Sequence, residues 1–295
     1  MALLLRIFGI IFPVFAVAGI GVLYGMRHRP DMAVVNRLNM EVFAPALVFW
    51  ALADKPFDLA ANLGLAFGGA AVVLGSGLLL WPLARLLGLD VKTFLPPMMF
   101  NNSGNMGIPL ALFAFGEPAL QAAVVLFVVE MVLHFTLGFY ILDHTTRFSR
   151  LLRMPMILAT LAGLGCGIAG LRLPGPLAET VRLLGQVSVP LLLFSLGVRL
   201  REVDLRDWRT GVLGAVLCPL SGLAMALALL PLLALDELQV AQLLLFGALP
   251  PAVLNVLVAE QYRQEPERVA SIVMIGNLGA LVTLPLVLFF VLPGA

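Results

Sequence analysis

The chain has 295 residues, of which 61% are hydrophobic and 12% are charged, with a formal net charge of +1. A soluble domain carries about 25% charged residues, so this composition excludes soluble enzymes, nucleic-acid binders and secreted disulfide scaffolds. It indicates an all-α integral membrane protein whose surroundings are the lipid bilayer.

Ten apolar runs are long enough to form membrane helices. A helix needs about 20 mostly apolar residues to cross the hydrocarbon core. That window predicts spans at 3–25, 33–53, 59–87, 91–115, 118–142, 154–171, 176–199, 208–234, 237–260 and 267–292. The first run continues to Tyr24, longer than the apolar part of a cleaved signal peptide, which is about 7–15 residues. We therefore interpret it as a span.

The basic residues predict the orientation. An even number of spans places both termini on one side of the membrane. The connections after odd-numbered spans hold fourteen of the 18 basic residues: Arg27, Arg29, Arg37, Arg85, Lys92, Arg147, Arg150, Arg153, Arg199, Arg201, Arg206, Arg209, Arg263 and Arg268. The other side holds Arg6, Lys55, Arg172 and Arg182. The positive-inside rule then predicts an inner-membrane protein with both termini on the extracytoplasmic side. The segment from Arg199 to Arg209 is interpreted as an interfacial turn anchored by Trp208.

Short fragments of the first half recur in order in the second half. Residues 18–21 recur as 162–165, and Leu-Pro-Pro at 95–97 recurs at 249–251. Glu117-Pro118 recurs as Glu265-Pro266. The repeat unit is five spans, and an odd number of crossings inverts the second copy, which is typical of transporters. The predicted organisation is a first repeat at 1–142, a cytoplasmic connection at 143–153 and a second, inverted repeat at 154–295.

Spans 4 and 9 contain matching helix breakers. Span 4 reads PPMMFNNSGNMGIP over residues 96–109, and span 9 reads GALPPAVLN over 247–255. Proline removes an amide donor and glycine tolerates unwound backbone, so we expect both helices to break inside the protein. Paired breaks in inverted halves indicate a substrate site near the midplane, with half-helix N-termini facing an anion. Neutral donors there are Asn101, Asn102, Asn105 and Asn255.

Other polar residues lie within the apolar runs. Glu130 falls near the middle of span 5 with His134 four residues on, on the same helical face. An ionisable pair at that depth indicates a proton relay or a structural hydrogen-bonded pair. Arg37 and Glu41 repeat this spacing in span 2, where we expect a structural salt bridge. Polar residues that could line a cavity are Gln121, Ser188, Ser195 and Asn277.

Small-residue motifs allow close helix contact. Gly21 and Gly25 have GxxxG spacing, as do Gly64 and Gly68. Such motifs serve contacts within a subunit as readily as between subunits. The sequence therefore leaves open whether the chain forms a homodimer.

The motifs resemble those of the auxin efflux carrier family of bacterial and plant membrane transporters. The likeness rests on NNSGNMGIPL at 101–110, Leu-Pro-Pro at 249–251 and AEQY at 259–262. It implies ten helices in two inverted halves, with spans 1, 2, 6 and 7 as a scaffold and spans 3–5 and 8–10 as a moving transport domain. It also implies that helices 4 and 9 cross at their breaks beside a small carboxylate.

The resemblance carries functional expectations for particular positions. It assigns substrate contacts to Asn101, Asn105, Pro109, Pro251 and Asn255. Bacterial members of the family include malate and malonate carriers. The connection from Asp143 to Arg153 is short here, which argues against regulation through a long phosphorylated loop of the kind found in plant members.

The favoured function is a secondary carrier of small organic carboxylates, either auxin-like compounds or dicarboxylates, that works by alternating access. The coupling ion, a proton or sodium, stays open, and an anion channel is the less favoured alternative. His28, His134 and His144 lie in different segments and no His-Glu-x-x-His motif occurs, so no enzyme activity, cofactor or metal site is expected.

Overall fold

The structure is a computed structural model that describes residues 2–144, 153–200 and 207–292. Four of the basic residues used for orientation, Arg147, Arg150, Arg201 and Arg206, lie outside the described residues, as do residues 1 and 293–295. The described part is all-helical, with one isolated β-bridge and no strand. The expectation of an all-α protein is confirmed for these residues.

Six helical segments of the described residues are long and apolar enough to cross a membrane. They are Ala2–His28, Leu59–Leu86, Glu117–Leu142, Gly175–Leu200, Trp208–Leu232 and Pro266–Val291. Large apolar side chains such as Phe8, Leu78 and Phe290 point outward and are exposed, as the lipid-facing side of a membrane helix requires. The protein is therefore a multi-pass membrane protein. Ten crossings stay a prediction.

The helical elements follow the predicted segments closely. The long helices are α1 (Ala2–His28), α4 (Leu59–Leu86), α10 (Gly175–Leu200), α11 (Trp208–Leu229) and α14 (Pro266–Val291). The second predicted span is divided into α2 (Ala33–Leu38), η1 (Asn39–Phe43) and α3 (Ala44–Ala53), and α9 (Pro155–Ala169) occupies the sixth. The fifth contains η3 (Glu117–Ala119), α7 (Leu120–Leu133), η4 (His134–Gly138) and α8 (Phe139–Leu142).

Spans 4 and 9 are interrupted, as the helix breakers predict. The fourth consists of α5 (Val91–Met99), η2 (Ser103–Gly107) and α6 (Ile108–Phe115). The ninth consists of α12 (Glu237–Gly247) and α13 (Leu254–Tyr262). The short helix η6 (Leu230–Leu232) lies between α11 and α12. We call residues 100–102 the first break and residues 248–253 the second break. α5 continues through Pro96 and Pro97 before it ends, whereas the second break contains its two prolines.

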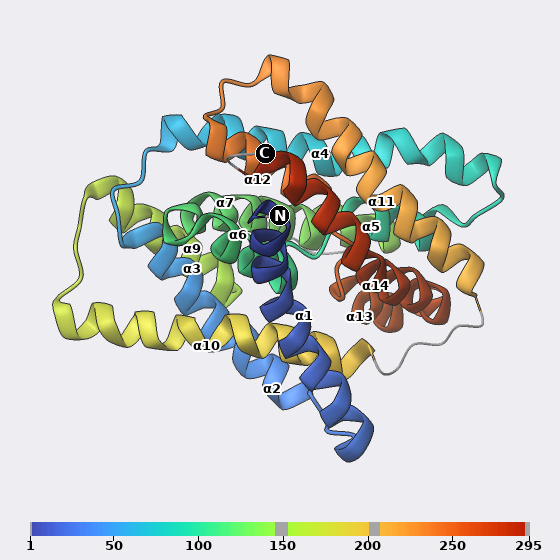
Figure 1. Cartoon of the computed structure of the whole chain (residues 1–295), viewed down its shortest axis with the longest axis horizontal. Coiled ribbons are helices and arrows are strands. Elements are labelled where there is room, and N and C mark those ends of the chain that lie inside the picture. Colours follow the sequence, from blue (N-terminus) through green and yellow to red (C-terminus); the bar gives the residue numbers. More distant parts are fainter. Residues whose placement is uncertain (1, 145–152, 201–206, 293–295) are drawn as a thin grey trace.

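The helices form two groups. α1 packs against α10, and α9 packs against α3. α11 packs against α14 and α4, and α4 packs against α5 and α7. Figure 1 shows α10 along the lower side of the molecule and α4 and α11 on the upper side, with α5, α6 and α7 between them.

The glycine motif of α1 is used inside the chain. A Cβ atom on Gly21 would collide with the carbonyl oxygen of Phe194, and one on Gly197 would collide with the carbonyl oxygen of Ala18. α1 and α10 therefore approach each other as backbones, with no room for side chains at these points. This contact explains Gly21 without a second subunit.

The expected salt bridge between Arg37 and Glu41 is not formed. Within the described residues these two side chains make no ion pair, and both are exposed. η1 begins at Asn39 as a π-helix, in which the turn is wider than in an α-helix. Residues four apart across that point therefore lose the alignment that the α-helical spacing predicts.

Candidate functional site

The two breaks lie against each other. Asn101 and Pro251 form an isolated antiparallel bridge. The amide of Asn102 donates to the carbonyl of Pro250 at 2.7 Å, and the amide of Ala252 donates to the carbonyl of Phe100 at 2.9 Å. Each unwound segment thus satisfies the backbone of the other, which is what makes broken helices tolerable at membrane depth.

Asparagine side chains complete this pairing. The Asn101 Nδ2 donates to the Phe246 carbonyl at 2.7 Å, and the Asn255 Nδ2 donates to the Phe100 carbonyl at 3.0 Å. Carbonyls only accept, so the amide nitrogens must face them. Both side chains therefore cap carbonyls that the helix ends leave free.

A second pair of asparagines braces the junction from α14. The Asn102 Nδ2 donates to the Asn277 Oδ1 at 2.7 Å, and the Asn277 Nδ2 donates to the Pro251 carbonyl at 2.9 Å. Asn277 is fully buried and links both breaks. Three of the four asparagines named as donors to a substrate, Asn101, Asn102 and Asn255, therefore each use at least one amide N–H within the protein itself.

A cavity of about 160 Å³ lies beside the junction, and we call it the large cavity to distinguish it from a neighbouring cavity of about 20 Å³ near Ser103; a separate cavity elsewhere, described below, is larger than both. The first break contributes the predicted site residues Asn101 and Asn102 to its lining. η2 adds Gly104 and Asn105, and the start of α13 with its N-cap adds Leu254 and Val253. These residues begin the two half-helices. The first amides of a helix have no acceptor within the helix and carry the positive end of its dipole, so both half-helices direct partial positive charge at this cavity.

Asn105 is the asparagine of the group that remains available. It lines the large cavity and is half-buried. Within the part of the chain that the structure describes, its side chain makes no hydrogen bond. Its amide can therefore donate to a ligand without breaking an internal contact.

The large cavity also contains a charged residue that the sequence did not single out. Arg199, near the end of α10, lines it together with Ser195, one turn earlier, and with Asn36 and Asn39 from the second predicted span. From the sequence we interpreted Arg199 as part of an interfacial turn. The signal that points to the cavity is its spacing of four residues from Ser195, which puts both on one face of α10.

Glu130 and His134 lie together at the wall of the large cavity. The His134 Nδ1 is 3.3 Å from the Glu130 Oε1, and the two residues are 2% and 4% exposed. The Ser103 Oγ donates to the Glu130 Oε2 at 2.9 Å. The imidazole stacks on the Phe100 ring with centroids 4.2 Å apart. The pair is therefore in contact both with the first break and with the cavity.

The other predicted site residues lie elsewhere. Pro109 is buried in the first turn of α6, and Ser188 is fully buried in α10. Gln121 lines a different cavity of about 310 Å³ at the opposite end of α3, near Lys55 and Arg182. The structure does not bring these residues, or Asn277, to the large cavity. Among the described residues, no three His, Cys, Asp or Glu side chains gather closely enough to hold a metal ion.

Comparison with known proteins gives two matches. Residues 145–288 match the family described as Membrane transport protein. The chain is also 25% identical over 314 aligned residues to a protein of Rhizobium meliloti (strain 1021) named "Putative malonate transporter", with 98% of this chain and 97% of that protein covered. The family match includes the motif at 249–251 but not that at 101–110, whereas the match to the Rhizobium protein extends over nearly the whole chain.

Proposed function

We propose that this membrane protein is a secondary carrier of small organic dicarboxylates of the malonate type, because it is similar to a family of membrane transport proteins and to a protein named as a malonate transporter. The substrate binds in the large cavity, and transport proceeds by alternating access. The relative's name suggests the substrate class, and the cavity suggests how such an anion is held.

The observation that carries this proposal is the convergence of three positive groups on one cavity. The N-terminal ends of η2 and α13 both face it, and Arg199 lines it. A short dicarboxylate presents two negative ends. One carboxylate would bind the free amides of the half-helices and the Asn105 side chain, and the other would pair with Arg199.

The alternating motion rests on the inverted-repeat architecture. In it, helices 4 and 9 cross at the two breaks, and spans 1, 2, 6 and 7 form a scaffold for the moving spans 3–5 and 8–10. Helix packing supports this division, because α1 contacts α10 while α9 contacts α3. Span 1 thus pairs with span 7, and span 6 pairs with span 2. In the proposed repeat, spans 1 and 2 of the half 1–142 correspond to spans 6 and 7 of the half 154–295, so the two contacts are equivalent by the internal symmetry.

The accessible side of the large cavity follows from the proposed orientation. Asn36 and Met40 line it together with Arg199. These residues lie beside the connections that follow spans 1 and 7, which carry the basic excess. In an inner membrane with both termini outside, the cavity therefore faces the cytoplasm.

Glu130 and His134 are the proposed coupling pair. Both are buried and both line the large cavity. Ionisable side chains at membrane depth are energetically costly, and they usually mark functional sites. A proton held by the pair in one state and released in the other would couple dicarboxylate movement to the pH gradient. Sodium coupling, transport driven by the membrane potential alone, and a purely structural role for the pair are the alternatives.

Uptake into proteoliposomes tests the substrate site. We expect saturable malonate uptake and accelerated counterflow, and Arg199→Gln should raise the half-saturation concentration by about ten- to a hundredfold, because a hydrogen bond to a charged group contributes about 1.5–3 kcal/mol. Arg182→Gln is the control, since this arginine lies on the same helix but pairs with Glu179 at the surface. Unsaturable flux without counterflow would instead identify a channel, and equal affinity in both variants would remove Arg199 from the site.

An imposed pH gradient tests the coupling pair. Gradient-driven malonate uptake should disappear in Glu130→Gln, which keeps the shape of the side chain and removes its titration, while counterflow persists. If Glu130→Gln lowers uptake equally with and without the gradient, the pair is structural. A response to a sodium gradient in place of the pH gradient would favour the symport alternative.

A further inference from the structure

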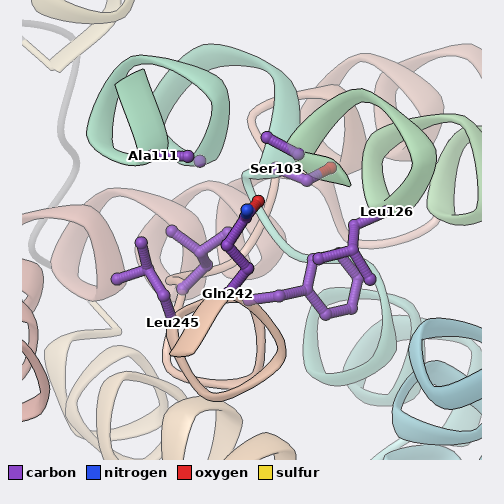
Figure 2. A pocket seen from close by; sticks show the side chains of 9 residues that line it. Ser103, Ala111, Leu126, Gln242 and Leu245 are labelled. Carbon is purple, nitrogen blue, oxygen red and sulfur yellow. The ribbon is translucent and has the colours of Figure 1, made fainter. Parts of the chain in front are cut away.

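Another, much smaller cavity lies beside Ser103. It measures about 20 Å³ and is lined by Ser103, Ala111 and Leu126 on one side and by Gln242 and Leu245 of α12 on the other. We call it the small cavity. Figure 2 shows the amide group at the end of the Gln242 side chain directed toward Ser103 and Ala111.

Gln242 is the unusual member of this lining. It is 2% exposed, and neither its Nε2 nor its Oε1 has a hydrogen-bond partner within the described residues. Buried amides in proteins are nearly always hydrogen-bonded. A cavity that can accommodate a water-sized probe volume of about 10–15 Å³ can hold one water molecule, provided that polar partners are present. The small cavity meets both conditions.

Ser103 connects the small cavity to the proposed coupling pair. Its hydroxyl hydrogen is given to the Glu130 Oε2 at 2.9 Å, and its oxygen lone pairs remain able to accept a hydrogen bond. Ser103 lines the small cavity but not the large one, while Glu130 lines the large cavity but not the small one. The Ser103–Glu130 hydrogen bond is thus the polar link between the two spaces.

We propose that the small cavity holds a water molecule positioned by Gln242, and that protons pass between this water and Glu130 through the Ser103 hydroxyl. This inference rests on the proposed coupling role of Glu130. It places the proton route of the pair in the small cavity, separate from the cavity that binds the substrate. Gln242 is a positioning residue in this route and does not itself carry a proton.

The transfer is a balanced relay. A proton that arrives on the water passes to the Ser103 Oγ while Ser103 releases its own hydroxyl proton to the Glu130 Oε2. The water and the hydroxyl are restored, and the carboxylate becomes the carboxylic acid. The reverse sequence returns the proton to the small cavity.

The charges around the route favour a proton over a metal cation. The titratable groups that line the large cavity are Glu130, His134 and Arg199, and none lines the small cavity. His134 also lines a third cavity, which includes Lys92. A cation in the small cavity would have two neutral oxygens from Gln242 and Ser103 and no carboxylate, which is a poor ligand set for a hard cation.

The experiment separates proton movement from substrate movement. Purified variants are reconstituted with a trapped pH dye, and malonate uptake under a pH gradient is compared with malonate counterflow, which requires no net proton transfer. Gln242→Met fills the cavity and removes both amide atoms, Ser103→Ala removes only the hydroxyl, and Gln242→Asn keeps an amide and leaves room for water. Ser221→Ala is the control, because its hydroxyl donates only to Cys218 within α11.

We expect Gln242→Met and Ser103→Ala to lose gradient-driven uptake and the dye signal while they keep counterflow, and Gln242→Asn and Ser221→Ala to keep all three. If both Gln242→Met and Ser103→Ala retain gradient-driven uptake while Glu130→Gln loses it, the route is wrong and the coupling pair stands. If Glu130→Gln also retains it, the coupling proposal fails first. Should Gln242→Met not reconstitute, Ser103→Ala decides alone, because it removes a single oxygen atom.

Discussion

The two breaks carry the same Leu-Pro-Pro motif but use it differently. In the first, the helix continues through Pro96 and Pro97 and unwinds only at residues 100–102; in the second, the prolines form the unwound segment. The backbone bridge joins Asn101 to Pro251, whereas the motif match aligns Asn101 with Asn255, four residues further on. Four residues are about one helical turn. A motif repeat can therefore locate both breaks and still fail to give the residues that face each other across them.

The two breaks also differ in how their polar groups are used. η2, which follows the first break, contributes Gly104 and Asn105 to the large cavity. The second break also lines the large cavity, through Ala252 and Val253, but it gives its Pro250 and Pro251 carbonyls to Asn102 and Asn277. We therefore expect substitutions near the first break to change substrate affinity and those at the second break to change stability.

The largest effect is expected for Asn255→Ala. This change removes hydrogen bonds to the carbonyls of Phe100 and Ala252, both at 3.0 Å. Both carbonyls keep a backbone donor, the amides of Ala252 and Asn255 respectively, so the cost is that of two lost hydrogen bonds, about 0.5–1.5 kcal/mol each. The purified protein should melt well below the wild type in a thermal denaturation assay, and transport should fall with the amount of folded protein. Wild-type melting with lost transport would instead place Asn255 in the binding site.

Asn105→Ala should give the opposite pattern. Its amide faces the large cavity, so its loss should leave melting unchanged and raise the half-saturation concentration for malonate by about ten- to a hundredfold, from a contribution of about 1.5–3 kcal/mol. Asn62→Ala is the matched control, since Asn62 donates to the Asp58 carbonyl one turn earlier, away from the cavity. Reduced stability without a change in affinity would contradict the assignment.

A smaller effect separates the breaks by their tolerance of a methyl group. A Cβ on Gly276 would lie 2.6 Å from the Pro251 Cδ, part of a rigid ring in the bridge, while one on Gly104 would meet the Phe127 ring at 2.9 Å, and that side chain can turn away. Gly276→Ala should therefore cost about 1–3 kcal/mol of stability. Thermal melting of both variants checks this, with Gly279→Ala as the control, because a Cβ there would make an ordinary contact, 3.5 Å from the Ala215 Cβ.

The smallest effect concerns the loops that follow the breaks. Glu265 accepts hydrogen bonds from Thr93 and Arg268, and Arg268 also pairs with Asp207 at 2.7 Å. Glu117, its counterpart in the first half, makes no hydrogen bond or salt bridge within the described residues. Charged side chains thus hold the loop at Glu265 in place, whereas the loop at Glu117 has no such contacts among the described residues.

This difference predicts a weak pH dependence. Burial raises the pKa of Asp207, but hydrogen bonds from Thr210 and Arg268 outweigh it and hold the pKa below its ordinary value of 3.8. Because the folded pKa lies below the unfolded one, the stabilisation is complete above pH 3.8 and is lost as the pH falls through the folded value. The melting temperature of the wild type should fall over this acidic range by slightly more than that of Asp207→Asn. If the two melting temperatures fall in parallel with pH, Asp207 makes no pH-dependent contribution to stability.

The sequence predicted what depends on local chemistry. Helix ends near Phe100 and Gly247, and the i,i+4 contact of Glu130 with His134, follow from breakers and helical spacing. Two comparisons confirmed the family resemblance. Roles that depend on distant partners were not accessible: the Asn102–Asn277 bond spans 175 positions, and no local pattern distinguishes an asparagine that caps a carbonyl from one that faces a ligand.

The same limit explains the residues that the sequence analysis passed over. Gln242 is one of two glutamines near the start of an apolar run, and Arg199 belongs to a cluster of basic residues. Only the packing of α12 against η2, and of α10 beside the breaks, gives these side chains a common space with Ser103 and Asn105. Polar residues on buried helix faces are the signal that would have found them.

The three π-helical turns of the described residues, η1, η2 and η4, all border the large cavity, through Asn39 and Met40, Gly104 and Asn105, and His134 and Phe135. A π turn holds one residue more than an α-helical turn. Each of these three wall segments therefore contains one residue more than a regular α-helix would need. If the π turn shifted along the helix by one position, the adjoining side chains would rotate by about 100°, while the helix kept its backbone hydrogen bonds. The side chains that face a bound substrate could therefore change without unfolding of the helix.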